Sequence, residues 1–406
     1  MNNVYRLGCI GTGNISNAAH IPAYVSHRRI MKVTAIFDTN PDHANRTKQH
    51  YIQLMQEANS PVDWEIVICD TIDDLWSHVD IVDICTSLRF HSHYAALALQ
   101  HNVHAMSEKP MARTWWEAQH VANAARTSAA LFQLNDDNLF IPRYQAMRNV
   151  VESGAIGDVQ HVWIARGTYS SKRAAWFFDP IEGGGGAILD YGSHAVASTW
   201  FMIGFDKEPQ EVRSLGVRVK NRTRLIEGRL QTIHVDDDAH FKIRYRNPES
   251  GDWINVVIEA TWSWPDLAEN GSDVKGYIEV QGSKGSVTSV FDENDKEYLK
   301  ITDRFFGERL IPIKSYMSED LSFEDEMVHF CRTIEQGAES LLNAERGATI
   351  IKMINGAQLS ELNRRQSVSL DEVEAFTRQF DRDGRSVLEV ADRIAIAFNE
   401  PHRVGC

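Results

Sequence analysis

The sequence predicts a two-domain chain: an N-terminal α/β domain with a parallel sheet, then a C-terminal α+β domain with a large, mostly antiparallel open sheet. Three observations support this prediction. The first third alternates short apolar runs with helical patterns, as strands joined by crossover helices do. After about residue 135, strand patterns follow one another with turn residues between them. With 406 residues, the chain is also too long for one ordinary core.

The first domain is expected over residues 1–135 and should carry six parallel strands. Its apolar runs are short and continuous, which is typical of strands covered by helices on both faces. The runs are Val4–Ile10, Val33–Phe37, Glu65–Cys69, Ile81–Thr86, Val103–Met106 and Ala130–Leu134. Helical patterns between them cover Asp42–Ala58, His91–Gln100 and Thr114–Arg126. Six such strands would complete a dinucleotide-binding sheet.

The second domain is expected over residues 136–366, followed by a helical extension over residues 367–406. A helix is predicted at Pro142–Glu152, and strands at Val159–Ala165, Ala239–Tyr245, Ile254–Trp262 and Tyr277–Val280. The later helical patterns are Ser322–Glu335, Ala344–Asn363, Leu370–Gln379 and Val387–Phe398. The acidic run Asp236–Asp238 is interpreted as a solvated turn rather than a metal site.

Net charge, hydropathy and cysteine spacing limit the kinds of partner that the protein can bind. The formal net charge of −14 gives no general attraction to nucleic acid or to an anionic membrane. No apolar run is long enough to span a bilayer, and the N-terminus leads directly into a strand rather than a signal peptide. Five scattered cysteines without a Cys-x-x-Cys pair indicate buried, reduced thiols. We therefore expect a soluble, cytoplasmic protein that binds small molecules.

A glycine-rich loop follows the first strand and opens a helical pattern. It consists of Gly11, Thr12, Gly13, Asn14 and Ile15, in which Gly11 permits a tight turn and Gly13 lets backbone approach a pyrophosphate. This position favours a Rossmann dinucleotide site over a plain turn.

Asp38 lies 25 residues after Gly13, at the end of the second strand. There its carboxylate would bind the adenine ribose hydroxyls and repel a 2′-phosphate, so NAD is favoured over NADP. The alternative is an ordinary Asp in a strand-end turn.

Two further groups of residues suggest chemistry. Lys109 follows the fifth strand, at the sheet edge where open α/β folds bind ligands. Asp190 and His194 are four residues apart in a helical pattern over Ala187–Ile203, which places them on one face. The glycine run 183–186 before them would let backbone approach a bound sugar or nicotinamide. Taken singly, the pair could be a structural hydrogen bond and the run a flexible loop.

Several motifs together resemble the Gfo/Idh/MocA family of oxidoreductases, named after glucose-fructose oxidoreductase, inositol dehydrogenase and a rhizopine catabolism protein. Glu108-Lys109-Pro110 is the family signature, and the resemblance extends to about residue 290. The other matching segments are Thr86 to Ala95 around His91, Asp137 to Pro142, Ser153 to Asp158 and Gly184 to His194. Ser87 and Leu88 depart from the Pro and Asn of the family pattern, which affects the contacts expected near the nicotinamide ribose.

The resemblance implies an NAD-dependent oxidoreductase that transfers hydride between nicotinamide and a ring hydroxyl of a sugar, sugar derivative or cyclitol. Lys109 would polarise the reacting oxygen, Asp190 would bind an adjacent hydroxyl, and either Lys109 or His194 would take the proton. The Lys109-Pro110 bond would be cis. Further cofactor contacts are expected from Thr86, His91, Glu108 and Trp176, and further substrate contacts from Asn138 and Lys172. For Trp176 and Lys172 the alternatives are a core position and a solvated cation.

The resemblance also allows two other functions. Some relatives are redox-neutral NAD-dependent glycosidases, which oxidise a ring hydroxyl transiently, and at least one is a non-catalytic dinucleotide-binding regulator. A homodimer or homotetramer is expected from the sheet edge that the family uses for assembly. No metal site is expected. Four histidines, His91, His93, His101 and His104, are interpreted as helix-surface residues because no carboxylate or thiolate spacing accompanies them.

Overall fold

The computed structural model describes residues 4–168, 174–264, 276–305, 307–313, 321–382 and 384–402. The chain divides into two compact units. Unit 1 comprises Met1–Ala112, Glu117–Asp137 and Asp320–Ala348, and unit 2 comprises Arg113–Trp116, Asn138–Glu319 and Thr349–Cys406. The second domain, expected as one continuous range, is thus interrupted by a segment that packs in unit 1.

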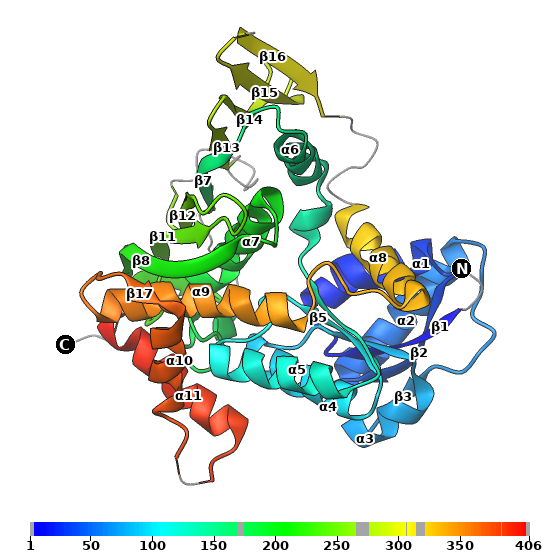
Figure 1. Ribbon diagram of the computed structural model, residues 1–406. Coiled ribbons are helices and arrows are strands. Elements are labelled where there is room, and N and C mark those ends of the chain that lie inside the picture. The colour runs from blue at the N-terminus through cyan, green and yellow to red at the C-terminus, as the bar shows by residue number, and fades with distance from the viewer. Residues whose placement is uncertain are drawn as a thin grey trace. The chain divides into compact units, whose positions relative to one another are not determined.

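Unit 1 contains a six-stranded parallel sheet in the order β3-β2-β1-β4-β5-β6 (Figure 1). This is the Rossmann order. Strands β2 and β3 are added on one side of β1, and strands β4, β5 and β6 are then added on its other side. All six strands coincide with predicted runs: β1 (Tyr5–Ile10), β2 (Met31–Phe37), β3 (Val67–Ile68), β4 (Ile81–Ile84), β5 (His104–Glu108) and β6 (Phe132–Asn135). The predicted α/β class of this part is confirmed.

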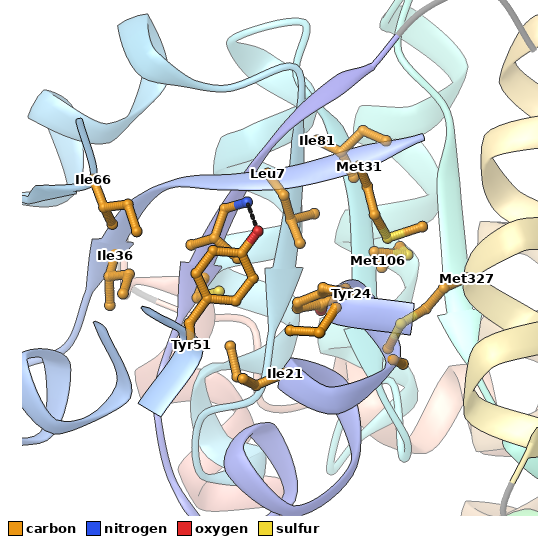
Figure 2. Packing of buried hydrophobic residues seen from close by; sticks show 14 of the residues in the cluster. Leu7, Ile21, Tyr24, Met31, Ile36, Tyr51, Ile66, Ile81, Met106 and Met327 are labelled. Carbon is orange, nitrogen blue, oxygen red and sulfur yellow. Dashed lines mark hydrogen bonds between the residues drawn. The ribbon is translucent and has the colours of Figure 1, made fainter. Parts of the chain in front are cut away.

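Helices join these strands and cover the sheet. They are the π-helical turn η1 (Ser16–His20), α1 (Ile21–Ser26), α2 (Pro41–Glu57), α3 (Ile72–Leu75), η2 (Trp76–His78), η3 (Leu88–Phe90), α4 (His91–Gln100) and α5 (Trp115–Thr127). The hydrophobic core of unit 1 contains Leu7 of β1, Met31 of β2, Tyr24 of α1 and Tyr51 of α2, all essentially buried (Figure 2).

A helix from late in the chain also belongs to unit 1. Met327 of α8 (Ser322–Gln336) is fully buried in the same cluster as Leu7 and Tyr24 (Figure 2). Phe330 of the same helix is also fully buried in this cluster. Burying apolar side chains of this size is worth about 1.5–3 kcal/mol each. This burial explains why α8 belongs to unit 1, whereas the predicted domain boundaries placed it in the second domain.

Unit 2 is built on a nine-stranded sheet in the order β16-β15-β14-β13-β7-β12-β11-β8-β17 (Figure 1). Only β7 and β12 pair in parallel, and the other neighbours are antiparallel. The strands are β7 (Val159–Gly167), β8 (Glu208–Arg218), β11 (Asp238–Arg246), β12 (Trp253–Thr261), β13 (Tyr277–Gly282), β14 (Gly285–Phe291), β15 (Glu297–Asp303), β16 (Gly307–Pro312) and β17 (Val368–Ser369). The mostly antiparallel sheet is as predicted.

Strand β8 and the β14–β16 meander were not predicted. Strand β16 is exposed along its whole length, so no burial pattern marks it in the sequence. Its backbone is held by pairing with β15, from Tyr298 opposite Pro312 to Asp303 opposite Gly307. Strand β8 carries a proline and several charges. Hydrogen bonding to a neighbour, rather than side-chain periodicity, thus defines these strands.

Helix α7 (Ala187–Ile203) packs against β7, β11 and β12 on one face of this sheet. Unit 2 also contains most of η4 (Asp137–Phe140), α6 (Pro142–Glu152), η5 (Ala175–Phe178), the β9–β10 hairpin (Thr223–Ile226 and Arg229–Thr232), α9 (Ala344–Leu362) from Thr349 onward, α10 (Leu370–Arg378), α11 (Val387–Asn399) and η7 (Glu400–His402). The C-terminal helices α10 and α11 bury Val373, Val390, Ile394 and Phe398 together with Leu359 of α9. The predicted bounds of all these long helices agree with the structure to within about two residues.

The predicted state of the cysteines is confirmed where the structure describes them. Cys9, Cys69, Cys85 and Cys331 are buried free thiols, and Cys406 lies outside the described residues. Within the described ranges, no helix combines the length and the hydropathy needed to cross a membrane.

Candidate active site

The glycine loop of unit 1 has the geometry of a dinucleotide-binding turn. Gly11 has φ +79°, and a Cβ there would lie 2.7–2.8 Å from the side chain and backbone of Thr86. Only glycine fits between the two loops at this point. A Cβ at Gly13 would meet no atom within 4 Å, and Gly13, Asn14 and Ile15 are exposed. The loop is therefore open at the position where backbone would approach a pyrophosphate.

Asp38 joins the end of β2 to this loop. Its Oδ2 accepts hydrogen bonds from the backbone N–H (2.8 Å) and the hydroxyl (2.7 Å) of Thr12, and its Oδ1 accepts the N–H of Asn40 (2.8 Å). A carboxylate has about four acceptor sites, so these bonds orient the group without exhausting it. The loop and carboxylate together fit the adenosine and pyrophosphate parts of a dinucleotide.

His91 occupies a different position from the one its spacing suggested. The ring is 2% exposed, with Nδ1 2.8 Å from the Pro110 carbonyl oxygen and Nε2 3.0 Å from that of Thr86. Burial lowers its pKa, although the carbonyl oxygens oppose the shift. The prediction of a helix-surface histidine is therefore wrong. His91 instead links the loop after β4 to the Glu108-Lys109-Pro110 segment, while its expected contact with the cofactor stays a prediction.

The prediction of a helix-surface position is also wrong for one of the other three histidines. His104 begins strand β5 and is half-buried, so it is not a helix-surface residue. His93 lies on α4, and His101 follows that helix and stacks on Trp76.

The Glu108-Lys109-Pro110 segment follows β5 at the carboxyl edge of the parallel sheet. The Lys109-Pro110 bond is cis, as predicted. Oε2 of Glu108 accepts the backbone N–H of Lys109 at 3.1 Å, and Oε1 lies 3.0 Å from Nε2 of His20. Glu108 is thus bound on both oxygens by the chain itself. Lys109 is half-buried beside it.

In unit 2, Asp190 and His194 lie one turn apart on α7, as predicted, and are 6% and 9% exposed. Oδ2 of Asp190 accepts the indole N–H of Trp262 at 2.9 Å. Trp262 is fully buried and packs with Phe178, Ala187 and the edge of Phe177. Sequence reasoning did not identify Trp262, because its contact with Asp190 spans 72 residues.

The start of α7 is fixed by Asp236, which is fully buried. Its carboxylate accepts the N–H groups of Gly186 (2.9 Å) and Ile188 (2.8 Å), and its carbonyl accepts that of Ala187 (3.1 Å). Burial raises the pKa of Asp236 to about 7, against the effect of these bonds. A distant carboxylate therefore satisfies backbone donors that the helix cannot satisfy itself.

The predicted solvated turn at Asp236–Asp238 is therefore wrong, because all three residues are buried. Asp237 is bound by Arg224 and Ser263, and Asp238 by Arg218. A buried carboxylate requires such partners, whereas a run of acidic letters more often marks a solvent-facing turn.

The glycine run 183–186 packs closely within unit 2. A Cβ at Gly184 (φ +69°) would lie 2.4 Å from Cβ of Arg113, and one at Gly186 would lie 1.7 Å from the Asp236 carbonyl oxygen. All four glycines are buried. These contacts argue against a flexible loop, while the expected approach of a ligand to this backbone stays a prediction.

The remaining predicted substrate and cofactor residues are only partly described. The half-buried Trp176 stacks on Phe177 with ring centroids 3.8 Å apart. Asn138 is buried in η4. Lys172 lies outside the described residues. The roles of all three stay predictions.

The fold and these residues define a dinucleotide-binding oxidoreductase, and comparison with known proteins agrees. Residues 5–136 match the family model "Oxidoreductase family, NAD-binding Rossmann fold", and residues 144–288 match the "GFO/IDH/MocA C-terminal domain". Together the two models cover most of the chain.

Curated relatives and solved structures extend this match. The chain is similar to levoglucosan dehydrogenase of Pseudarthrobacter phenanthrenivorans, with 25% identity over 71% of this chain and 74% of the relative. It is also similar to D-glucoside 3-dehydrogenase of Escherichia coli, with 26% identity over 49% of this chain and 54% of the relative. A solved structure of levoglucosan dehydrogenase with NADH and L-sorbose superposes with a TM-score of 0.75, at 19% identity over 91% of this chain and 99% of that one.

The chain belongs to the Gfo/Idh/MocA family. It is an NAD-binding oxidoreductase, as the glycine loop, Asp38 and the Glu-Lys-Pro motif predicted.

Proposed function

We propose that the protein transfers hydride between NAD and a ring hydroxyl of a sugar, sugar derivative or cyclitol. The observation that carries this proposal is the buried Asp190–His194 pair on α7, with Asp190 held by Trp262. Hydrogen-bonding groups buried in this way can bind a polyol and move its proton. The sugar dehydrogenases among the relatives support the substrate class.

The alcohol must lose its hydroxyl proton as its carbon gives up hydride. Because an alcohol is a very weak acid, a side chain must accept that proton. We propose two alternatives for the acceptor: the neutral amine of Lys109, or His194 while the Lys109 ammonium hydrogen-bonds and polarises the reacting oxygen; in both, Asp190 binds a neighbouring hydroxyl. Bound nicotinamide supplies the hydride acceptor. Asn138 and Lys172 are proposed as further substrate contacts.

We also propose that the coenzyme is NAD rather than NADP because of Asp38. Its carboxylate accepts two hydrogen bonds from Thr12, which hold it beside the glycine loop. A 2′-phosphate at that place would meet this negative charge. Further contacts with the nicotinamide half are proposed for Thr86, Glu108 and Trp176.

Replacing Lys109 tests the catalytic assignment. The wild type and Lys109→Ala are screened with NAD⁺ on sugars, cyclitols and aryl glycosides, following NADH absorbance and released aglycone in parallel. We expect Lys109→Ala to lose about 10²–10⁴-fold in kcat, the usual worth of a general acid–base group. NAD affinity, measured by calorimetry, should stay within a few-fold. Lys296→Ala, in an exposed turn, is the control.

Three results would contradict parts of this proposal. Near-wild-type turnover by Lys109→Ala would remove Lys109 from the mechanism. Aglycone release without net NADH would show a redox-neutral glycosidase instead of a dehydrogenase. NAD binding without turnover of any compound would indicate a dinucleotide-binding regulator.

We further propose a homodimer or homotetramer in a cytoplasmic setting. The sheet face opposite α7 carries Trp163, Trp253, Arg244 and Tyr277, residue types that are enriched at interfaces. The free buried thiols suit a reducing compartment.

A further inference from the structure

Unit 1 contains a buried cluster of polar side chains behind the Glu108-Lys109 segment. At its centre is His20, at the junction of η1 and α1, with a side chain that is fully buried. Its Nδ1 lies 2.7 Å from Oδ2 of Asp83 on β4, and its Nε2 lies 3.0 Å from Oε1 of Glu108 on β5. Each ring nitrogen therefore faces a carboxylate from a different strand.

This arrangement requires an additional proton. A neutral imidazole has one N–H and can donate to only one of two carboxylates, whereas an imidazolium donates to both. The other oxygen of Glu108 already accepts the N–H of Lys109 at 3.1 Å, so both carboxyl oxygens are engaged as acceptors. Burial is the largest single effect and lowers the pKa of His20, but Asp83 and Cys85 together raise the pKa of the imidazole well above its ordinary value.

Neighbouring groups hold Asp83 ionised. The Tyr24 hydroxyl donates to its Oδ2, and the Cys85 thiol lies 3.4 Å from the same oxygen. Burial would raise the pKa of Asp83, but His20 and these donors lower it. The nearby thiols of Cys85 and Cys9 have raised pKa values because they are buried, so both stay uncharged.

We propose that His20 is a positioning residue of the active site. Bridging Asp83 and Glu108 as an imidazolium, it holds the Glu108 carboxylate in the orientation that accepts the Lys109 N–H. It thereby fixes the backbone from which the Lys109 side chain extends. The proposal rests on the catalytic role proposed above for Lys109.

Helix α8 closes the cluster from the other side. Phe323 packs against the His20 ring with centroids 5.6 Å apart, and Glu326 is fully buried. Neither Glu326 carboxyl oxygen has a hydrogen-bond partner among the described residues. Burial, followed by Glu108 and Asp137, raises its pKa well above the ordinary range, with Asp136 adding to the effect. Glu326 is thus held as an uncharged acid, and His20 remains the cationic partner of Glu108.

The same atoms do not have the spacing of a metal site. His20, Asp83 and Cys85 offer ligand atoms within 4.8 Å of one another. Two ligands bound at about 2.0–2.1 Å to one tetrahedral zinc would lie about 3.3 Å apart. The 2.7 Å between His20 Nδ1 and Asp83 Oδ2 is instead a hydrogen-bond distance.

Asp83→Asn tests the proposal because it removes one of the two negative partners of His20 and leaves the side-chain shape nearly unchanged. The full-length variant and wild type are compared in kcat between about pH 6 and 9, at saturating NAD⁺ and polyol. We expect the variant to be within about 3-fold of wild type at the acid end. It should then lose at least about 10-fold more than wild type as His20 deprotonates with rising pH.

Two further variants separate positioning from folding. His20→Gln should have reduced kcat throughout, without the additional alkaline loss, because no titrating ring remains. Asp80→Asn, the same change just before β4 in a partly exposed carboxylate paired with Arg6, should leave the pH profile unchanged. Side-chain ¹⁵N NMR should show both His20 nitrogens protonated at pH 8 in wild type, and a titrating ring in Asp83→Asn.

Four outcomes would overturn the proposal. These are wild-type kcat in His20→Gln, the same pH-independent loss in Asp83→Asn and Asp80→Asn, a neutral His20 ring in wild type at pH 7, or stoichiometric zinc that His20→Gln loses. The NMR result needs no substrate and tests the bridge alone. A charged His20 in a protein that turns over no polyol would instead show that the proposed function fails, and with it the catalytic part of this proposal.

Discussion

The indole N–H of Trp262 donates to the carboxylate that we propose for substrate binding. Trp262 donates to Asp190 at 2.9 Å, and both groups are buried. A hydrogen bond to a charged group is worth about 1.5–3 kcal/mol, and a buried acceptor that loses its donor becomes costly. If Asp190 binds substrate as proposed, Trp262 acts on the substrate by orienting this carboxylate.

Trp262→Phe removes this donor while keeping an aromatic ring in the cluster with Phe177 and Phe178. We expect kcat/KM for the polyol to fall about 10–100-fold, the rate equivalent of one such hydrogen bond. NAD affinity should not change. Steady-state kinetics and calorimetry provide the two measurements.

The matched control is Trp64→Phe, which removes an indole hydrogen bond to the Val33 carbonyl in unit 1. An unchanged kcat/KM in Trp262→Phe, or an equal loss in both variants, would show that the bond to Asp190 has no functional effect.

At the scale of elements, helix α7 shows how local pattern and distant contact combine. Its bounds, Ala187–Ile203, were predicted from periodicity alone, and so was the shared face of Asp190 and His194. Its N-terminus depends on Asp236, 50 residues away from the Gly186 N–H that it accepts. The glycine at 186 is required there because a side chain would collide with the Asp236 backbone.

The raised pKa of Asp236 gives a defined pH dependence of stability. The folded chain retains this proton up to about pH 7, whereas the unfolded chain releases it near the ordinary value of 3.8. The stability from this group is therefore complete below about pH 4 and is lost as pH rises towards 7. Asp236→Asn cannot titrate, so wild type should lose up to about 1.4 kcal/mol per pH unit relative to the variant over this window.

Chemical unfolding at pH 4.5, 6 and 7.5 measures this difference. The slope with pH is the readout, because the amide of Asn also changes the cap itself and so the stability at any single pH. Asp371→Asn, at an exposed position on α10, controls for a general charge effect. Parallel pH curves for wild type and Asp236→Asn would contradict the assignment.

At the scale of the molecule, helix α7 lies on one face of the nine-stranded sheet of unit 2. The strand register places Lys242, Val257, Trp163 and Glu279 in one row across the opposite face. Trp253 is 39% exposed, and the guanidinium of Arg244 lies 4.0 Å from its ring centroid. Apolar and aromatic area of this kind favours association with a second copy of the chain.

Trp253→Glu should therefore shift the protein towards the monomer, because it replaces an exposed aromatic ring of the proposed interface with a carboxylate. Light scattering coupled to size exclusion should show at least a tenfold weaker association. Leu230→Glu, on the β9–β10 hairpin, is the matched control, since Leu230 is 75% exposed but lies outside the large sheet. A monomeric wild type, or equal effects of both changes, would exclude this face as the interface.

The sequence by itself determined the features that depend on short motifs or on regular spacing along the chain. These are the six-stranded parallel sheet, the long helices, the glycine loop with Asp38, the Glu108-Lys109-Pro110 motif and the Asp190–His194 face. Each depends on a period of two or 3.6 residues, or on a short motif with its own chemistry. Such patterns are independent of how the chain packs at long range.

The tertiary structure alone decided which residues support those groups. His20 meets Asp83 and Glu108 across 63 and 88 residues, and Trp262 meets Asp190 across 72. It also decided that α8 packs in unit 1, that Asp236–Asp238 is buried and that the glycine run contacts its own chain. No local period encodes these contacts, because they arise only when separate elements pack and exclude water from the polar groups between them.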